Sequence, residues 1–303
     1  MTEFIQQINE DFPGLFFIQG RANATYPYSN SILCGEYLID TGISPRLIKK
    51  LRKEHEVSRV ILSHWHEDHI SGNYLFKDSE VDFMAHIRDI PIIEDIYKMN
   101  EYYGVENTQI GEDFLKLMEA YNLISVKVGA IIEENQILEI NDDLKLKILH
   151  TPGHTAGHLC FYEMNTKFAF FADYDLTRFP YYGNIDANLL DFEKSLILLK
   201  SLNAEKVAGG HRGLIEGKSV INEEIDRYLN IIEKRDERIL KFIPEQTTPI
   251  KPEDLKNKNL IYRRYSDYEE FELLSEVLMI TKHFEKFLVK KLIIPENDGF
   301  ILN

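Results

Sequence analysis

Three of the ten histidines fall within six residues of one another, in the run His64-Trp65-His66-Glu67-Asp68-His69. An apolar stretch over 59–62 precedes the run and predicts a strand, and a helix is expected to begin within the run. Side chains two residues apart in an extended chain point the same way, so His64 and His66 can bind one ion. Asp68 and His69 then lie in the first helical turn and can face a second ion. Imidazole and carboxylate groups together suit zinc and similar divalent ions.

Three later segments each place a further ligand-type residue just past a predicted strand, namely His154, Asp173 and His211. Loops at strand ends commonly carry functional side chains on a rigid scaffold. One histidine alone is more often a surface residue or a packed core residue. The spacing of the 64–69 run, with these three residues after it, instead favours a metal site.

The predicted elements alternate in a way that suits two sheets packed face to face with helices outside. Strands are expected over 15–18, 31–39, 59–62, 82–85, 136–140, 144–149, 158–162, 168–171 and 206–208. Helices are expected over 45–54, 88–123, 186–202, 219–242 and 269–291. The change to helical periodicity after Gly217 predicts a domain boundary at that point.

The pattern of ligand-type residues resembles a known family. The run His64-x-His66-x-Asp68-His69, followed in order by His154, Asp173 and His211, is similar to the motifs of the metallo-β-lactamase fold superfamily. The segment 38–42, Leu-Ile-Asp-Thr-Gly, matches a further landmark of that family. The resemblance covers roughly residues 15–215.

The resemblance implies an α+β fold, a four-layer αββα sandwich of the metallo-β-lactamase type. The catalytic domain would occupy residues 1–217, with a helical insertion over 88–123. A small, mainly helical module over 218–303 would follow it.

The resemblance also implies a role for each ligand-type residue. Two groups of three would each hold one ion: His64, His66 and His154 in the first, and Asp68, His69 and His211 in the second. Asp173 would bridge the two ions. Asp40 matches an aspartate that orients the histidine run by hydrogen bonds from outside the ligand set. Such support changes metal affinity or activity by about 10–100-fold.

Two divalent ions about 3.5–4 Å apart can share a water molecule and convert it to hydroxide at neutral pH. Asp68 can orient that hydroxide and pass its proton toward the leaving group. We therefore expect a dinuclear metal-dependent hydrolase that uses a metal-bridging hydroxide on a small ester, thioester or lactone. Zinc is the expected metal, with iron and manganese as alternatives, because the affinity order alone does not select the metal in a cell.

The segment after Asp173 is expected to run beside the metals and to contact the substrate. Tyr181 or Tyr182 could donate to a developing oxyanion, and Arg178 could bind an anionic group. The alternative is an aromatic loop that packs on its own scaffold. The insertion over 88–123 has two interpretations as well, a lid over the active face or plain packing.

Two other functions stay open. One is a metal-dependent phosphodiesterase or single-strand endoribonuclease, because 218–303 loosely resembles the winged-helix-like module of a superfamily branch that contains such nucleases. A basic patch over 256–265 favours RNA, whereas the net charge of −15 opposes it, because phosphate binding depends on basic side chains. The other is a metal-containing binding or regulatory protein with little turnover.

The composition of the 303 residues, 44% apolar and 28% charged, is that of a globular protein. No apolar run approaches the roughly 20 residues that a membrane helix needs, so no membrane partner is expected. Residues 1–7 lack a basic stretch followed by an apolar one, which predicts no signal peptide. With only two cysteines, a cytoplasmic location is expected. The expected partner is a small-molecule substrate, with a homo-oligomer as a further option.

Overall fold

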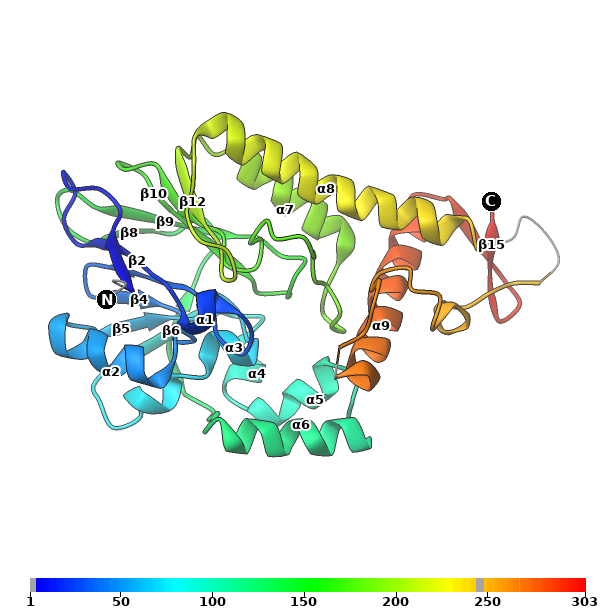
Figure 1. Ribbon diagram of the computed structural model, residues 1–303, viewed down its shortest axis with the longest axis horizontal. Coiled ribbons are helices and arrows are strands. Elements are labelled where there is room, and N and C mark those ends of the chain that lie inside the picture. The colour runs from blue at the N-terminus through cyan, green and yellow to red at the C-terminus, as the bar shows by residue number, and fades with distance from the viewer. Residues whose placement is uncertain (1–3, 244–247, 267) are drawn as a thin grey trace.

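The computed structural model describes residues 4–243, 248–266 and 268–303. Two β-sheets pack face to face, and helices cover the outer face of each sheet (Figure 1). This arrangement confirms the α+β fold and the four-layer αββα sandwich expected from the sequence.

The first sheet has seven strands and mixed pairing. In spatial order these are β1 (Ile5–Gln7), β2 (Leu15–Ile18), β3 (Ser31–Cys34), β4 (Tyr37–Ile39), β5 (Arg59–Ile61), β6 (Asp82–His86) and β7 (Val128–Ile132). Strands β1 to β4 are antiparallel, and β4 to β7 are parallel. The strand expected over 31–39 is in fact the hairpin of β3 and β4. Strand β7 was missed because it is an edge strand whose residues alternate between partly buried and exposed.

The second sheet has six strands. In spatial order these are β13 (Ile215–Glu216), β12 (Lys206–Ala208), β11 (Phe168–Phe170), β10 (Leu159–Glu163), β9 (Lys145–His150) and β8 (Ile137–Glu139). Only β11 and β12 pair in parallel. Because parallel neighbours end at the same edge, the loops after β11 and β12 emerge side by side.

Three apolar cores hold the layers together. Between the sheets, Ile32 and Ile61 of the first sheet meet Phe161 and Phe170 of the second. The outer face of the first sheet packs against helices from the N-terminal half, and the outer face of the second packs against helices from the C-terminal half. Full burial of one such side chain contributes roughly 1.5–3 kcal/mol, so these contacts fix the register of both sheets.

Helix α2 (Pro45–Glu54) begins where the sequence predicts it. The Ser44 side chain accepts a hydrogen bond from the Leu47 amide, and Pro45 occupies the first turn. Helix α7 (Leu189–Ser201) begins three residues later than expected. The reason is Asn188, whose side chain accepts from the Asp191 amide and caps the helix.

Residues 88–123 connect β6 to β7 through a series of short helices. These are α4 (Ile90–Ile93), η2 (Ile96–Lys98), α5 (Met99–Tyr102) and α6 (Gln109–Ala120). Ile92, Ile93 and Met118 are buried in the core beneath the first sheet. The apolar face of this insertion is therefore packed, and it also borders the pocket described below.

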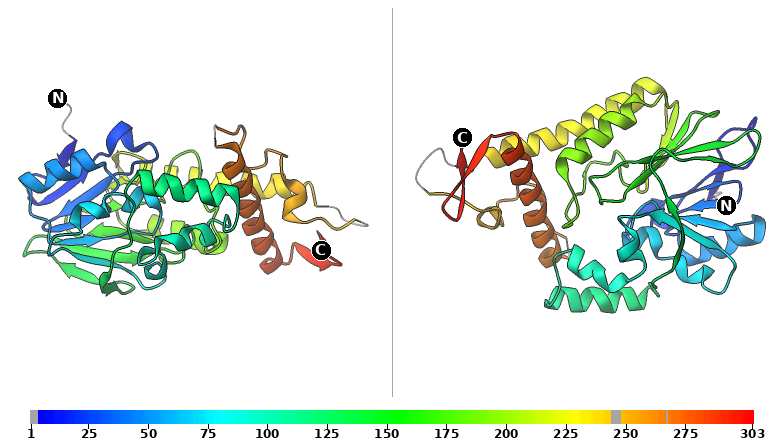
Figure 2. Two further views of the ribbon diagram at one scale, coloured as in Figure 1. Left: turned by 90° about the horizontal axis from the view of Figure 1, so that it is seen from below. Right: turned by 180° about the vertical axis from the view of Figure 1, so that it is seen from behind.

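The C-terminal part adds two long helices and a hairpin. Its elements are α8 (Lys218–Leu240), η3 (Pro252–Leu255), α9 (Glu269–Val289), β14 (Ile293–Glu296) and β15 (Gly299–Leu302). Helix α8 runs along α7, and α9 crosses at its far end (Figure 1). Figure 2 shows the hairpin at the opposite end of the molecule from the N-terminus. The winged-helix-like arrangement remains a prediction.

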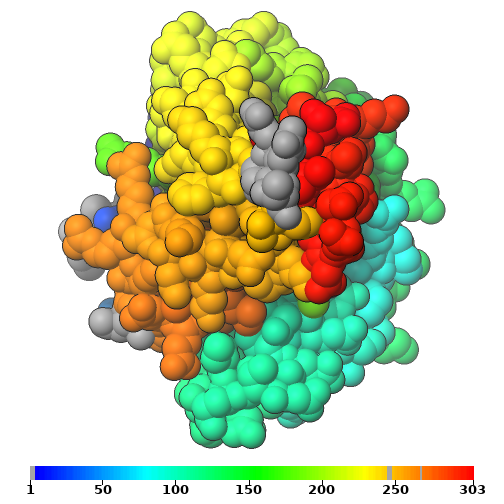
Figure 3. All heavy atoms as spheres, turned by 90° about the vertical axis from the view of Figure 1, so that its right-hand side faces the viewer, coloured from blue at the N-terminus to red at the C-terminus, as the bar shows by residue number. Residues whose placement is uncertain are grey.

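Helix α9 also reaches the insertion. The rings of Tyr103 and Phe271 lie 5.6 Å apart, and Leu274 packs against the same core. In Figure 3 the C-terminal residues (orange and red) cover the face between α8 (yellow) and the insertion (teal). Within the described residues, no helix is both long enough and apolar enough to cross a membrane.

A buried polar chain joins the C-terminal helices. Asp236 on α8 accepts a hydrogen bond from Nδ1 of His283 on α9 at 2.5 Å, and Nε2 of His283 accepts from the Tyr182 hydroxyl at 2.9 Å. His283 is fully buried and makes both bonds as a neutral ring. Burial lowers the pKa of His283 to about 4; Asp236 opposes this shift, and Arg235 and Lys286 add to it.

This lowered pKa predicts an acid-sensitive fold. In the unfolded chain His283 takes up a proton near pH 6.5, whereas in the folded chain it does so only near pH 4. The free energy of unfolding should therefore fall by about 3 kcal/mol from pH 7 to pH 4 on account of this group. Urea unfolding of wild type and His283→Gln across this range measures it, and the variant should lose that part of the slope. A control variant, His55→Gln, should keep it; equal slopes in all three proteins would contradict the prediction.

Candidate metal centre

Seven ligand-type side chains converge at one edge of the sandwich. They come from loops and a short helix that follow strand ends: His64, His66, Asp68 and His69 after β5, His154 after β9, Asp173 after β11 and His211 after β12. Two clusters result, His64, His66, His154 and Asp173 in one, and Asp68, His69 and His211 in the other. Within each cluster, one donor atom per residue lies within 4.8 Å of the others.

The first cluster is tightly drawn together. Nε2 of His154 lies 2.9 Å from Nδ1 of His66 and 3.3 Å from Nε2 of His64. Oδ2 of Asp173 lies 3.2 Å from Nε2 of His154 and 3.8 Å from Nε2 of His64. Four donor atoms thus surround one small volume.

Asp173 also reaches the second cluster. Its Oδ1 lies 2.7 Å from Nε2 of His69, and its Oδ2 lies 3.7 Å from Nε2 of His211. Within this cluster Nε2 of His211 is 3.1 Å from Oδ2 of Asp68. The Asp173 carboxylate therefore stands between the two clusters, the place that the resemblance implies for a bridging ligand.

The local sequence explains how the 64–69 run is divided between the clusters. His66 has extended backbone angles, φ −60° and ψ 142°, and stands just before helix α3 (Glu67–Ile70). His64 and His66 therefore project from extended chain, whereas Asp68 and His69 project from the first turn of α3. Gly42 lets the loop after β4 lie directly against this turn, because a Cβ there would come 1.6 Å from the Asp68 carbonyl oxygen.

Asp40 fixes the 64–69 run by hydrogen bonds from outside the ligand set. One carboxylate oxygen accepts from the Ser63 amide at 2.7 Å, and the other accepts from the Ser63 hydroxyl and from Nδ1 of His69, each at 2.7 Å. Nδ1 of His64 in turn donates to the Ser63 hydroxyl at 2.9 Å. Asp40 is fully buried and has a left-handed φ of 64°, a strained conformation that is typical of functional sites.

Backbone carbonyls orient the remaining imidazoles. Nδ1 of His154 donates to the Tyr181 carbonyl at 2.9 Å, and Nδ1 of His211 donates to the Ala24 carbonyl at 2.8 Å. A carbonyl can only accept, so each Nδ1 carries a proton, and in the neutral ring each Nε2 presents a lone pair to its cluster. Ala24 ends a turn in which it and the two residues before it all have left-handed φ.

The two clusters differ in electrostatics. Burial lowers the pKa of His64 and His66 well below the usual histidine value, which keeps both rings in the neutral, metal-binding form. Burial acts the same way on His69 and His211, but nearby carboxylates, Asp173 first, outweigh it and raise the pKa of both rings.

The donor set fits divalent cations. Nε2 of His69 and Oδ1 of Asp173 are buried and face each other at 2.7 Å, and neither has another hydrogen-bond partner in the described structure. An unpartnered buried polar atom costs about 1–3 kcal/mol, and coordination of a cation would remove that cost. Gly210 leaves the space open, since a Cβ there would come 2.6 Å from Oδ1 of Asp173.

The sequence places Tyr26 and Tyr103 in segments expected near the active face, but it does not predict Glu67 or the contact of both tyrosines with it. Glu67 is buried beside Asp68, and its oxygens accept from the Tyr26 hydroxyl at 2.9 Å and the Tyr103 hydroxyl at 2.7 Å. Burial, together with Asp68, raises the pKa of Glu67 to about 7. The ring of Tyr103 stacks near that of His66 at 5.6 Å. No local pattern signals this cluster, because its members come from three distant segments.

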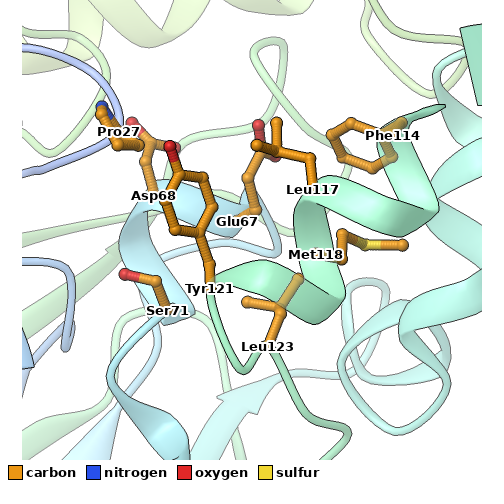
Figure 4. Close-up of a pocket in the computed structure, with 9 residues that line it drawn as sticks. All are labelled: Pro27, Glu67, Asp68, Ser71, Phe114, Leu117, Met118, Tyr121 and Leu123. Carbon is orange, nitrogen blue, oxygen red and sulfur yellow. The ribbon is translucent and has the colours of Figure 1, made fainter.

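A small, mostly apolar pocket lies beside Asp68, between α3 and α6 (Figure 4). It is a shallow hollow, and the space between its side chains is about 270 Å³ when open solvent is counted. Its lining residues are Pro27, Glu67, Asp68, Ser71, Phe114, Leu117, Met118, Tyr121 and Leu123. The insertion therefore supplies an apolar wall next to one of the candidate metal ligands.

The three expected substrate residues lie in different surroundings. The ring of Tyr181 is 6.0 Å from the rings of both His66 and His154. Tyr182 is buried and its hydroxyl bonds to Arg235 and His283, because successive side chains of this loop face opposite ways. Tyr182 is therefore not among the proposed substrate contacts. Arg178 is exposed.

Two other residues support the clusters from further out. Nε2 of His158 accepts from the Asp173 amide at 3.2 Å, and its Nδ1 donates to the Thr151 hydroxyl at 3.0 Å. Asp89 accepts from the Thr155 hydroxyl at 2.8 Å and from the Gly157 amide at 2.6 Å, which fixes the loop after His154.

The family profile described as the Metallo-beta-lactamase superfamily matches residues 29–211, a span that contains all seven ligand-type residues. The chain belongs to the metallo-β-lactamase superfamily. This superfamily member is accordingly a metal-dependent hydrolase with a metal-binding cluster of histidine and aspartate side chains.

Two curated relatives of this superfamily member align along most of its length. The Beta-lactamase-like protein 2 homolog of Caenorhabditis elegans is 24% identical over 278 residues, which cover 88% of this chain and 78% of the relative. The Hydroxyacylglutathione hydrolase of Pelagibacter ubique is 25% identical over 247 residues, which cover 79% and 87%.

Two solved structures share the fold of this superfamily member. A beta-lactamase domain protein from Burkholderia ambifaria has a TM-score of 0.71 at 14% identity, covering 99% of this chain and 93% of that one. A metallo-beta-lactamase family protein from Thermus thermophilus has a TM-score of 0.67 at 18% identity, covering 95% and 93%. The shared fold thus extends over nearly the whole chain.

The position of Asp173 generates a prediction. Asp173→Ala should weaken divalent-ion binding at both clusters, because its oxygens face both. His154→Ala and His211→Ala should each weaken binding at one cluster only. Metal content after dialysis against a graded series of Zn²⁺ buffers measures these effects by mass spectrometry. His55→Ala, which removes a histidine far from the centre, should leave the uptake unchanged, and a normal uptake by Asp173→Ala would contradict the prediction.

Proposed function

We propose that this protein is a two-ion hydrolase that acts on a small ester, thioester or lactone. The observation that carries the proposal is the place of Asp173, whose carboxylate faces two separate clusters of donor atoms. His64, His66 and His154 would hold one ion, and Asp68, His69 and His211 the other. We propose zinc, because imidazole nitrogens dominate both donor sets.

When bound, the ions act as Lewis acids that polarise the scissile carbonyl and lower the pKa of water. The chain's own contribution centres on Asp68. Burial raises the pKa of its carboxyl, but His69 and His211 outweigh burial and hold that pKa below its usual value. Asp68 is therefore ionised at neutral pH and can accept a proton from the attacking water and pass it toward the leaving group.

The side chains of the chain support direct attack by water. Burial raises the pKa of the Cys34 thiol to about 12 and also raises that of Cys160, so neither forms a thiolate nucleophile. Ser63, next to His64, is fully buried and donates its hydroxyl to Asp40. None of these three groups is available to form a covalent intermediate with the substrate.

Two observations support an acyl substrate with an apolar part. The lining of the pocket beside Asp68 is mostly apolar and includes Phe114, Leu117 and Met118 of α6. The rings of Tyr103 and Tyr181 flank His66. In addition, one relative is named for hydrolysis of a hydroxyacylglutathione, which is a thioester. The net charge of −15 disfavours a polyanionic substrate such as RNA.

A substrate panel tests the proposal. Thioester, lactone, bis-p-nitrophenyl phosphate and single-stranded RNA are each incubated with Zn²⁺-loaded protein, and turnover is compared. Thioester or lactone turnover should dominate, and Asp68→Asn should lower it by about 10²–10⁴-fold, because proton transfer is lost. Metal content is measured alongside, since Asp68 is also a proposed ligand.

Asp78→Asn, which neutralises an exposed carboxylate, is the matched control and should keep wild-type turnover. Dominant cleavage of RNA or of the phosphodiester would replace the acyl proposal with a nuclease or phosphodiesterase. Metal uptake without any turnover would instead favour a binding or regulatory protein.

The apolar pocket makes a separate prediction about chain length. Leu117→Asn should raise KM for a butanoyl thioester roughly 10-fold and for a hexanoyl thioester by more, while leaving acetyl thioester unaffected, because each methylene that loses its burial costs about 0.8 kcal/mol. Lys116→Asn places the same side chain on the exposed side of α6 and should change neither KM. An equal effect on all chain lengths would show that the pocket does not bind the acyl chain.

A further inference from the structure

The loop between β11 and α7 supports the His154 ligand directly. The Tyr181 carbonyl accepts from Nδ1 of His154 at 2.9 Å, which sets the tautomer of the ring. The Asn184 side chain donates to the His154 carbonyl at 3.0 Å, which fixes the backbone of the same residue. Any movement of this loop would therefore turn His154 away from His64 and His66.

Arg235, on the C-terminal helix α8, holds the part of this loop next to Tyr181, while Arg227 and Tyr228 of the same helix hold its earlier part. Nη1 of Arg235 donates to the Pro180 carbonyl at 2.7 Å and to the Tyr182 hydroxyl oxygen at 2.9 Å. Its guanidinium also lies 4.7 Å from the centre of the Phe179 ring. Arg235 is 1% exposed, so these contacts are screened from solvent. Arg235 thus contacts the residues on both sides of Tyr181, namely Pro180 and Tyr182.

Arg235 is itself anchored by the polar chain between α8 and α9. The Tyr182 hydroxyl, which accepts from Arg235, donates onward to His283, and His283 donates to Asp236. Lys286 then joins Asp236 to Glu193 of α7. From Arg235 to Asp236 each hydrogen bond has a defined donor and acceptor, so this part of the arrangement has one consistent set of proton positions. Such a chain is rigid, because no member can turn without leaving a buried group unpartnered.

Among the described residues, Arg235 makes no comparable contact with the second cluster, although α8 also reaches that side of the site, where Glu224 pairs with Arg212 next to His211. His69 is oriented by Asp40 and His211 by the Ala24 carbonyl, both from the N-terminal part of the fold. Nδ1 of His154 is thus oriented by the loop that Arg235 contacts, whereas the imidazoles of the second cluster are oriented by Asp40 and Ala24.

We propose that Arg235 is a positioning residue for His154, through which the C-terminal helices complete the first metal cluster. The inference rests on the proposed function in that it assigns one ion to His64, His66 and His154. It gives the C-terminal part a role at the centre that requires no contact with substrate.

The test measures each cluster separately. In a His211→Ala background only the first cluster keeps its histidines, and in a His64→Ala background only the second does. Arg235→Met should weaken Zn²⁺ binding about 10–100-fold in the first background, because an orienting contact is lost. It should leave the dissociation constant unchanged in the second background. Competition with a chromophoric chelator gives both values without relying on activity.

Two further variants guard against misfolding. Tyr182→Phe keeps the ring and removes only the hydroxyl, and it should weaken the first cluster in the same direction by a smaller factor. Ile232→Ala removes buried apolar contacts one turn away on α8 and should lower the melting temperature while leaving both dissociation constants unchanged.

Three outcomes would overturn the inference. Equal weakening in both backgrounds would mean a general loss of stability. Unchanged Zn²⁺ affinity in folded Arg235→Met, or in Tyr182→Phe where the former does not fold, would mean that His154 needs no such support. The same affinity loss in Ile232→Ala would mean that any loss of packing on α8 weakens the first cluster, so that Arg235 has no specific role. A wild-type chain that binds only one ion would refute the two-ion proposal. The inference about Arg235 would survive only if Arg235→Met still weakened the binding of that one ion.

Discussion

The rest of the metal centre depends on one nearly buried carboxylate, that of Asp173. Asp173 stands within 4 Å of His64, His69, His154 and His211, and its own pKa is held well below the usual value, because these imidazoles outweigh the effect of burial. A charge at this depth is tolerated only where opposite charge and oriented donors surround it. The sheets, the strand-end loops and the supporting hydrogen bonds together provide that surrounding.

The groups that orient the imidazoles lie on the side of each ring away from the metal clusters. Asp40, the Ala24 carbonyl and the Tyr181 carbonyl each fix the far nitrogen of one imidazole, so the near nitrogen has a single direction. Two of these supports have left-handed backbone, Asp40 at φ 64° and Ala24 at φ 55°, and Ala172 beside Asp173 has φ 45°. The packed sandwich holds these strained residues in place, which a flexible loop could not do.

The sequence alone was sufficient for the features that depend on local pattern. Extended chain before a helix start divides His64 and His66 from Asp68 and His69, and the capping of α2 by Ser44 is equally local. The Glu67 cluster could not be predicted, because its tyrosines lie 41 and 36 positions away in segments with no shared pattern. The surroundings of Tyr182 could not be predicted for the same reason, because its hydroxyl bonds to Arg235, which lies 53 positions along the chain.

The absence of a side chain at residue 210 has a consequence for how this scaffold can change over time. A methyl group there would collide with both Oδ1 of Asp173 and the His69 ring, whereas residue 210 itself lies beyond the end of β12 and outside both sheets. Mutation of that glycine codon to alanine would thus separate folding from cation uptake in one step. A lineage that kept the architecture but recruited it for a non-enzymatic purpose could have passed through such a replacement.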